Sequence, residues 1–122
     1  MVVHLVHKDD AGKLAVVAVL LKAGDTNPVI AALWSNLPVH KEAEVELQGM
    51  QIDPADLLPR DRSYYTFAGS LTTPPCSEGV TWYVLKSPSQ LSTGQIARFG
   101  KAYPMNARPL QPLNGRVVRA SQ

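Results

Sequence analysis

The chain has 122 residues, 45% of them hydrophobic and 18% charged, which predicts one globular domain over residues 1–122 and excludes a disordered or fibrous chain. The net charge is only +2 and no basic stripe is interleaved with aromatic residues, so we expect no nucleic-acid partner. The longest apolar stretch, residues 14–21, is too short to cross a bilayer, and no signal peptide is visible, so we expect no membrane partner.

The first two elements are expected to form an antiparallel hairpin. Residues 2–7 are rich in β-branched side chains and predict a buried strand. Residues 9–12 predict a turn, and residues 13–22 a second strand that is apolar enough to be covered on both faces. The strand pattern starts directly after Met1, which is unusual for a whole domain and suggests truncation.

The remaining pattern predicts short helices among further strands. Pro28 suits the first turn of a helix capped by Asn27, and Pro38 would end that helix. Further along the chain we expect a short edge strand within 42–49, one helical turn within 53–59, strands at 64–69, 80–85 and 117–120, a loop at 70–79, a helix through 94–101 capped by Ser92 or Thr93, and coil at 103–115. The fold class is therefore mostly β with short helices, an α+β arrangement.

Three histidines are candidates for metal binding, but their spacing separates two of them. His4 and His7 are three residues apart in a predicted strand, so they point to opposite faces and cannot hold one metal together. His40 follows Pro38 in a predicted loop. A strand histidine such as His4 is more often a satisfied core residue than a ligand, and a catalytic zinc usually needs three protein ligands.

The segment from Ser70 to Cys76 is more distinctive, because two hydroxyl residues precede two prolines that stiffen the backbone. Such a loop can orient water or an oxyanion. The alternative is a turn in which the hydroxyl groups satisfy nearby backbone groups. A serine nucleophile is not expected without a histidine–carboxylate pair, and nothing in the sequence activates the single cysteine, Cys76.

Taken together, the motifs resemble the C-terminal half of an α-class carbonic anhydrase domain. The most specific is Gly69-Ser-Leu-Thr-Thr-Pro-Pro75, and the others follow in the family's order over essentially the whole chain. These are His4-Leu-Val-His7, Leu14-Ala-Val16, Asn27-Pro28 with Leu33-Trp34, Leu57-Leu58-Pro59, Tyr64-Tyr65, Val80-Thr-Trp82 with Val84-Leu-Lys86, Asn106-Ala-Arg108-Pro109 and Gln111-Pro-Leu-Asn114. The resemblance implies part of a large, mainly antiparallel sheet.

The resemblance also implies a zinc cofactor held by three histidines, of which His4 would be the third. The first two, on a His-x-His strand, and a glutamate that orients the active-site threonine would precede Met1. His7 and His40, or another chain, are possible substitutes. Val2 stands where the family usually has a glutamate that accepts the other ring N–H of the third histidine, and loss of such a partner typically costs about 10- to 100-fold in metal affinity or activity.

By the same resemblance, the chain carries the parts that act on carbon dioxide and bicarbonate. Thr72 corresponds to the threonine that accepts a hydrogen bond from the zinc-bound hydroxide, and Thr73 to its neighbour that contacts bicarbonate. The apolar wall that holds carbon dioxide would consist of Val6, Leu14, Val16, Leu71, Val80 and Trp82. Zinc lowers the pKa of its bound water, so hydroxide exists near neutral pH.

Two functions follow from different readings of this chain. It is a sulfonamide-sensitive carbonic anhydrase chain whose site another chain completes, or a non-catalytic remnant that binds or supports other molecules.

An exposed apolar edge beside His4 predicts a homodimer or higher oligomer. The family in bacteria is typically exported, and Cys76 matches a cysteine whose disulfide partner would lie upstream, so we expect Cys76 to be free or to pair between chains.

Overall fold

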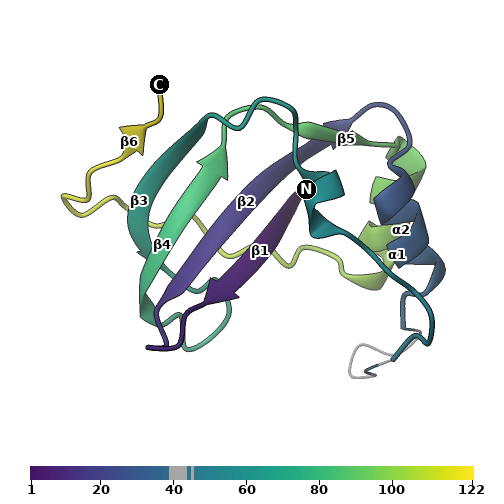
Figure 1. Ribbon diagram of the computed structural model, residues 1–122, viewed down its shortest axis with the longest axis horizontal. Helices are drawn as coiled ribbons and strands as arrows, with labels where there is room; N and C mark the ends of the chain where they lie inside the picture. The colour runs from purple at the N-terminus through teal and green to yellow at the C-terminus, as the bar shows by residue number, and fades with distance from the viewer. Residues whose placement is uncertain (39–43, 45) are drawn as a thin grey trace.

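The structure is a computed structural model that describes residues 1–38, 44 and 46–122 (Figure 1). Its described part forms a mixed sheet with helices at one end of it. The elements in chain order are β1 (Val2–Lys8), β2 (Leu14–Ala23), α1 (Pro28–Ser35), the 3₁₀ turn η1 (Pro54–Leu57), β3 (Tyr64–Ser70), β4 (Glu78–Leu85), β5 (Ser89–Leu91), α2 (Thr93–Ala102) and β6 (Arg119–Ala120). No helix in these ranges is long and apolar enough to cross a membrane.

The sheet has the order β1-β2-β4-β3-β6, with β5 paired to β2 at its far end. β1 and β2 form the expected antiparallel hairpin, and β3 pairs antiparallel with both β4 and β6. The pairings of β2 with β4 and with β5 are parallel, so the sheet is mixed. Parallel neighbours need a long connection, and here α1, η1 and β3 lie in the chain between β2 and β4.

β2 is apolar on both faces because each face packs against a different part of the molecule. Val19 and Leu21 belong to a core cluster with Ile30 of α1 and with Leu57 of η1. Val16, on the opposite face, belongs to a second cluster in the sheet and is 1% exposed. The expected burial of this strand on both faces is confirmed.

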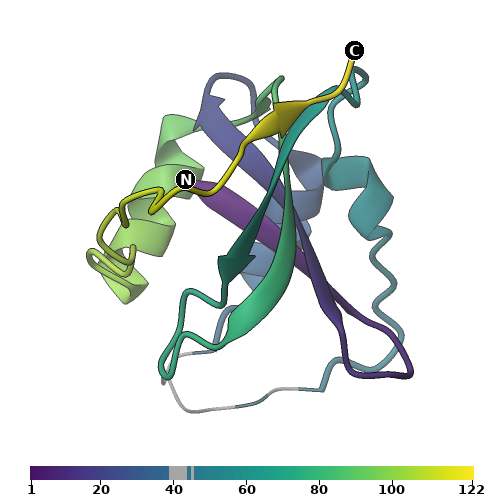
Figure 2. The ribbon, with the colours of Figure 1, turned by 90° about the vertical axis from the view of Figure 1, so that its left-hand side faces the viewer.

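The two helices lie side by side at the end of the sheet (Figure 2). Asn27 caps α1 as expected, because its side chain accepts hydrogen bonds from the backbone of Val29 and Ile30. The cap of α2 is Ser92, which exchanges hydrogen bonds with Gln95 in a capping box. Trp34 of α1 stacks on Phe99 of α2, with ring centroids 5.3 Å apart.

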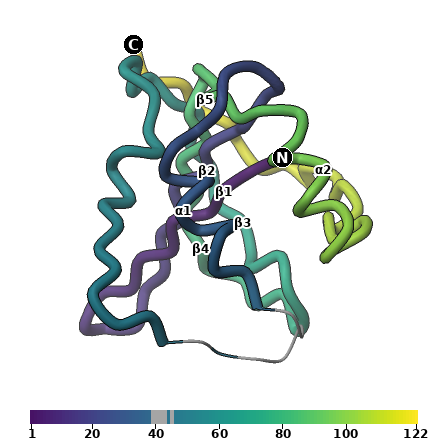
Figure 3. Tube along the Cα trace, turned by 90° about the vertical axis from the view of Figure 1, so that its right-hand side faces the viewer, coloured from purple at the N-terminus to yellow at the C-terminus, as the bar shows by residue number. Residues whose placement is uncertain are grey.

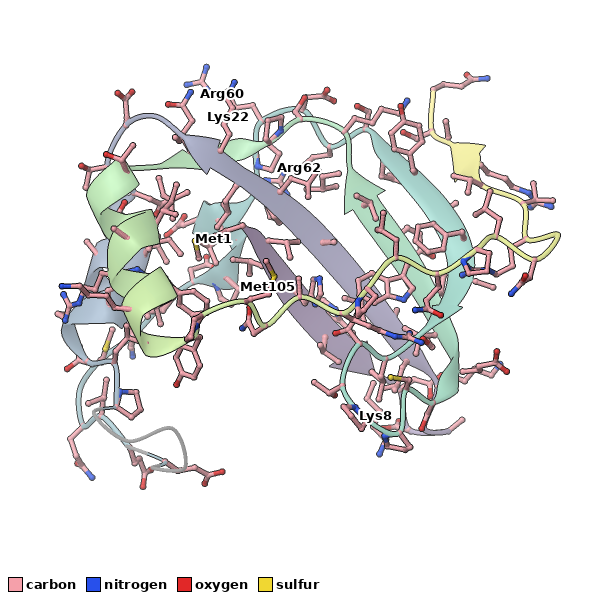
Figure 4. The ribbon with its side chains drawn as sticks, turned by 180° about the vertical axis from the view of Figure 1, so that it is seen from behind. Met1, Lys8, Lys22, Arg60, Arg62 and Met105 are labelled. Atoms are coloured by element: carbon pink, nitrogen blue, oxygen red, sulfur yellow. The ribbon has the colours of Figure 1, made fainter. Side chains whose placement is uncertain are left out.

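The connections differ from the expected pattern in small ways. The short strand β5 was not predicted, since Ser89–Leu91 is too short to show a period and owes its form to pairing with β2. β6 is shorter than expected, Arg119–Ala120. Of the edge strand predicted within 42–49, residues 42, 43 and 45 fall outside the described residues, and the described ones, 44 and 46–49, form no strand. From residue 46 to β3 the chain runs along one side of the molecule (Figure 3), and after α2 it crosses the back of the sheet to β6 (Figure 4).

Gln95 provides a test of how the helices are joined. Its side chain accepts hydrogen bonds from the backbone N–H groups of Asn27 and Ser92 and donates one to the Asn27 carbonyl, all in a site where Gln95 is 9% exposed. Gln95→Ala should lower the free energy of unfolding by about 1–3 kcal/mol in urea titrations, because buried backbone groups lose their partners. Gln90→Ala is the control. Gln90 also accepts a hydrogen bond from a backbone N–H group, but it is exposed, so water can take its place in the variant. A loss of unfolding free energy as large as that of Gln95→Ala would contradict this explanation.

Candidate functional site

The candidate site lies on the face of the sheet that the C-terminal segment crosses. A cavity of about 400 Å³ opens there and is lined by His4, Thr72, Trp82 and Arg108 among other residues. A second cavity of about 540 Å³ shares His4, Thr72 and Arg108 and adds Thr73. The predicted metal ligand and both predicted catalytic threonines therefore line one hollow, the second cavity.

His4 is placed there by strand register. It pairs with Ala18 on β2, and its ring meets the Trp82 ring edge-on, with centroids 4.9 Å apart. The side chain is open to solvent on one side, yet burial of the rest of the ring lowers the pKa of His4 below its ordinary value. Its ring makes no hydrogen bond to any other described residue. A neutral imidazole with free nitrogens is the form that binds metals.

The other two histidines do not join His4. His7 lies three residues along β1, and its Nδ1 is 3.0 Å from its own strand's Leu5 carbonyl oxygen, away from both cavities around His4. The prediction that His4 and His7 point apart is confirmed, so His7 is not a second ligand here. His40 lies outside the described residues. Among residues 1–38, 44 and 46–122, no group of three or more His, Cys, Asp or Glu side chains can hold a metal ion.

A zinc ion therefore does not fit a ligand set made from the described residues alone. His4 supplies one nitrogen on the cavity wall, whereas a catalytic zinc usually takes three protein ligands. Val2, on the same side of β1, lines both cavities and offers no acceptor for the His4 ring. Cys76 is a free thiol in this chain.

The threonines sit on a loop that leaves β3 at an irregularity. The pairing of β3 with β4 shifts register between Gly69 and Ser70, and such bulges commonly re-aim side chains near functional sites. The loop is closed by a backbone hydrogen bond from Leu71 to Ser77 and by one from Cys76 to Thr73. The Thr72 hydroxyl makes no hydrogen bond within the described part of the chain, so it is available to a bound molecule.

The predicted apolar wall forms mostly one cluster, but only Trp82 lines the cavity with His4 and Thr72. Val16 and Val80 are buried on the same face of the sheet as Trp82, and Leu14 and Leu71 pack against them. Val6 is 59% exposed on the outer strand. Ala18 and Trp82 of this cluster therefore line the cavity, whereas Val16 and Val80 are covered.

Sequence reasoning missed several wall residues. Ala18, Leu20 and Val84 line the first cavity and could have been found, because they share the sheet face of His4 and Trp82 by alternation. Arg108 lines both cavities as well, although no local signal in the sequence assigns it a role. Its guanidinium Nη1 donates to Ser70 Oγ at 2.9 Å.

Comparison with known proteins identifies a family and a fold. The family model for eukaryotic-type carbonic anhydrases matches residues 4–122. Carbonic anhydrase from Klebsiella pneumoniae is 50% identical over 119 residues, which cover 97% of this chain and 48% of that protein. The α-carbonic anhydrase from Thermovibrio ammonificans, solved with the inhibitor sulfanilamide, has a TM-score of 0.89 at 45% identity and covers 94% of this chain and 51% of that one.

A further similar structure carries a different name. Dioscorin, solved in complex with ascorbate, matches with a TM-score of 0.81 at 33% identity, covering 98% of this chain and 52% of that one. The chain spans about half the length of the curated relatives it matches.

The floor of the site depends on close packing between Gly69 and Trp82. A Cβ atom at Gly69 would lie 2.7 Å from Trp82 Cδ1, and the Trp82 ring is buried and cannot easily give way. Gly69→Ala should lower the free energy of unfolding by about 1–3 kcal/mol through overpacking and should shift the tryptophan fluorescence. The matched control is Gly100→Ala in α2, where nothing lies within 4 Å of the new Cβ. It should stabilise the protein by about 0.5–1 kcal/mol, and equal destabilisation of both variants would refute the steric argument.

Proposed function

This chain belongs to the eukaryotic-type carbonic anhydrase family, and from that premise we propose that it forms the part of a zinc-dependent carbonic anhydrase that hydrates carbon dioxide to bicarbonate and a proton. The observation that carries the proposal is that His4, Thr72 and Thr73 line one hollow. In this proposal His4 is a metal ligand, Thr72 orients the attacking oxygen and Thr73 contacts the product.

The walls of the hollow suit a neutral substrate. Trp82, Ala18, Leu20 and Val84 present hydrocarbon around His4, and carbon dioxide offers few groups for hydrogen bonding. The Thr72 hydroxyl can accept a hydrogen bond from the attacking oxygen and so fix the direction of its lone pair, because it makes no other hydrogen bond within the described ranges. Thr73, beside it, can bond an oxygen of bicarbonate.

The described residues supply one ligand of the three that the family's zinc requires. The remaining ligands would come from chain outside these 122 residues, since the chain spans about half of its curated relatives. Bound zinc would make a water molecule acidic enough to ionise near neutral pH. The contribution of this chain is to orient that oxygen, to shield it with apolar side chains and to complete the ligand set through His4.

A chimera tests this assignment. The part of the Klebsiella pneumoniae relative that this chain does not match is fused to the chain, and zinc content and the carbon dioxide hydration rate are measured. The chimera should bind about one zinc and show a rate that sulfonamides inhibit. His4→Ala should lose most of the zinc, because three-ligand binding needs each histidine. The chain alone should hold far less zinc than the chimera.

The threonine variants separate ligand loss from loss of orientation. Thr72→Ala should retain zinc and lower the hydration rate by about 100-fold, since the attacking oxygen loses its fixed direction. Thr72→Ser keeps the hydroxyl and is the matched control, with a rate close to that of the parent. A chimera that binds zinc at His4 but shows no sulfonamide-sensitive hydration would refute the proposal.

A non-catalytic binding role is the second candidate. It is favoured by the absence of a three-residue metal cluster within the described residues and by the similar fold of dioscorin, which was solved with ascorbate. In that case the apolar hollow would hold a small molecule without zinc. The chimera decides between the two, because only the enzyme predicts zinc-dependent turnover.

We further propose that the isolated chain forms a homodimer or higher oligomer through β1. The backbone of Met1 exchanges hydrogen bonds with Leu21, so alternate residues of β1 bond to β2. By this alternation the N–H and C=O groups of Val2, His4 and Val6 point outward, where no described strand pairs with them. An exposed edge with apolar side chains is a template for pairing with a second copy.

Light scattering at moderate protein concentration checks this. The chain should show at least twice its monomer mass, and Val6→Lys should shift it to monomer, because lysine on an edge strand disfavours pairing. Val117→Lys is the control, since Val117 is 68% exposed and lies just before β6, at the opposite end of the sheet from β1, and this variant should keep the parent's mass. A monomeric parent would contradict the proposal.

A further inference from the structure

Ser70 is held in place at both its side chain and its backbone. Its Oγ lies 2.9 Å from Arg108 Nη1 and 3.0 Å from the Leu71 carbonyl oxygen. Its own carbonyl accepts a hydrogen bond from Trp82 Nε1 at 3.0 Å. Ser70 stands two residues before Thr72, directly after the register shift in β3, so its position sets the start of the loop that carries the threonines.

The direction of these hydrogen bonds follows from the groups themselves. A guanidinium can only donate, so Ser70 Oγ must accept from Arg108, and the single hydroxyl proton is left for the Leu71 carbonyl. A donor that carries a positive charge makes the first bond strong and polarises the second. The chain of bonds therefore runs from Arg108 through Ser70 and ends on the peptide that joins Leu71 to Thr72.

From this geometry we propose that Arg108 is a positioning residue that fixes the Leu71–Thr72 peptide through Ser70 and thereby aims the Thr72 side chain into the hollow beside His4. Thr72 has no hydrogen bond of its own to the described residues, so its direction depends on this peptide. Arg108 lies 38 residues further along the chain than Ser70, between α2 and β6. The segment that crosses the sheet there (Figure 4) therefore sets the geometry of the loop. The inference deepens the proposed function, because it affects catalysis only if Thr72 orients the attacking oxygen.

Nuclear magnetic resonance of the chain itself tests the relay without any need for activity. The Leu71 carbonyl carbon and the Thr72 amide nitrogen both respond to a hydrogen bond on the Leu71 carbonyl. Arg108→Met and Ser70→Ala should each move these two signals in the same direction. The double variant should move them no further than Ser70→Ala alone, because both changes break one chain of bonds. Arg108→Lys keeps a charged donor and should restore part of the shift.

Arg116→Met is the matched control. Arg116 lines the same cavity, but its guanidinium donates to the carbonyls of Ala68, Pro112 and Leu113 and does not contact Ser70. This variant should leave the Leu71 and Thr72 signals in place. A folded Arg108→Met protein with unchanged signals, or equal shifts in the Arg116 variant, would overturn the proposal. If Arg108→Met does not fold, Ser70→Ala decides alone, and unchanged signals there overturn it equally.

The rate measurement separates this proposal from the function on which it rests. In the chimera, Arg108→Met should keep its zinc and reduce the hydration rate by about 10- to 100-fold, mainly in kcat, because Thr72 is misaligned rather than removed. A chimera without zinc or turnover would refute the proposed function while the resonance shifts still decide the relay. Full activity in Arg108→Met would refute the relay's role and leave the proposed function standing.

Discussion

β2 is buried on both faces, and the two sides of the molecule meet through it. Toward the helices it presents Val19 and Leu21, and toward the hollow it presents Val16 and Ala18. The register of β2 with its neighbours places His4 opposite Ala18 and Trp82 opposite Val16. A slip of one residue would move His4 to the helical face, so the core of the fold and the geometry of the candidate site are set by the same pairing.

Local patterns were sufficient to predict most of the elements around that strand. Alternation and β-branched residues indicated the hairpin of β1 and β2, and Asn27 marked the start of α1. The start of α2 was predicted at Ser92 or Thr93, and the structure has the cap at Ser92. The same alternation separated His4 from His7 correctly. These successes share a cause, because strand faces and helix caps depend on residues close together in sequence.

Local sequence patterns could not predict the features that form between distant segments of the chain. The parallel pairing of β2 with β4 joins strands separated by about half the chain, and the form of β5 exists only through its pairing with β2. Alternation places Val80 and Trp82 on one face of the sheet, but it does not tell which of the two lines the hollow; Trp82 does and Val80 does not. The contact of Arg108 with Ser70 likewise has no signature in either local sequence.

His4 lies on the outermost strand of the described sheet, and its backbone N–H and C=O point to the edge where no described strand pairs with them. Any strand that extends the sheet past β1 must therefore run directly beside this imidazole. A metal that bridges His4 and such a strand would bind only the joined form, so its binding free energy would add to that of the strand pairing by mass action. Metal binding and strand pairing would then be coupled. A higher metal concentration would favour the assembled form, and assembly would raise the affinity for the metal.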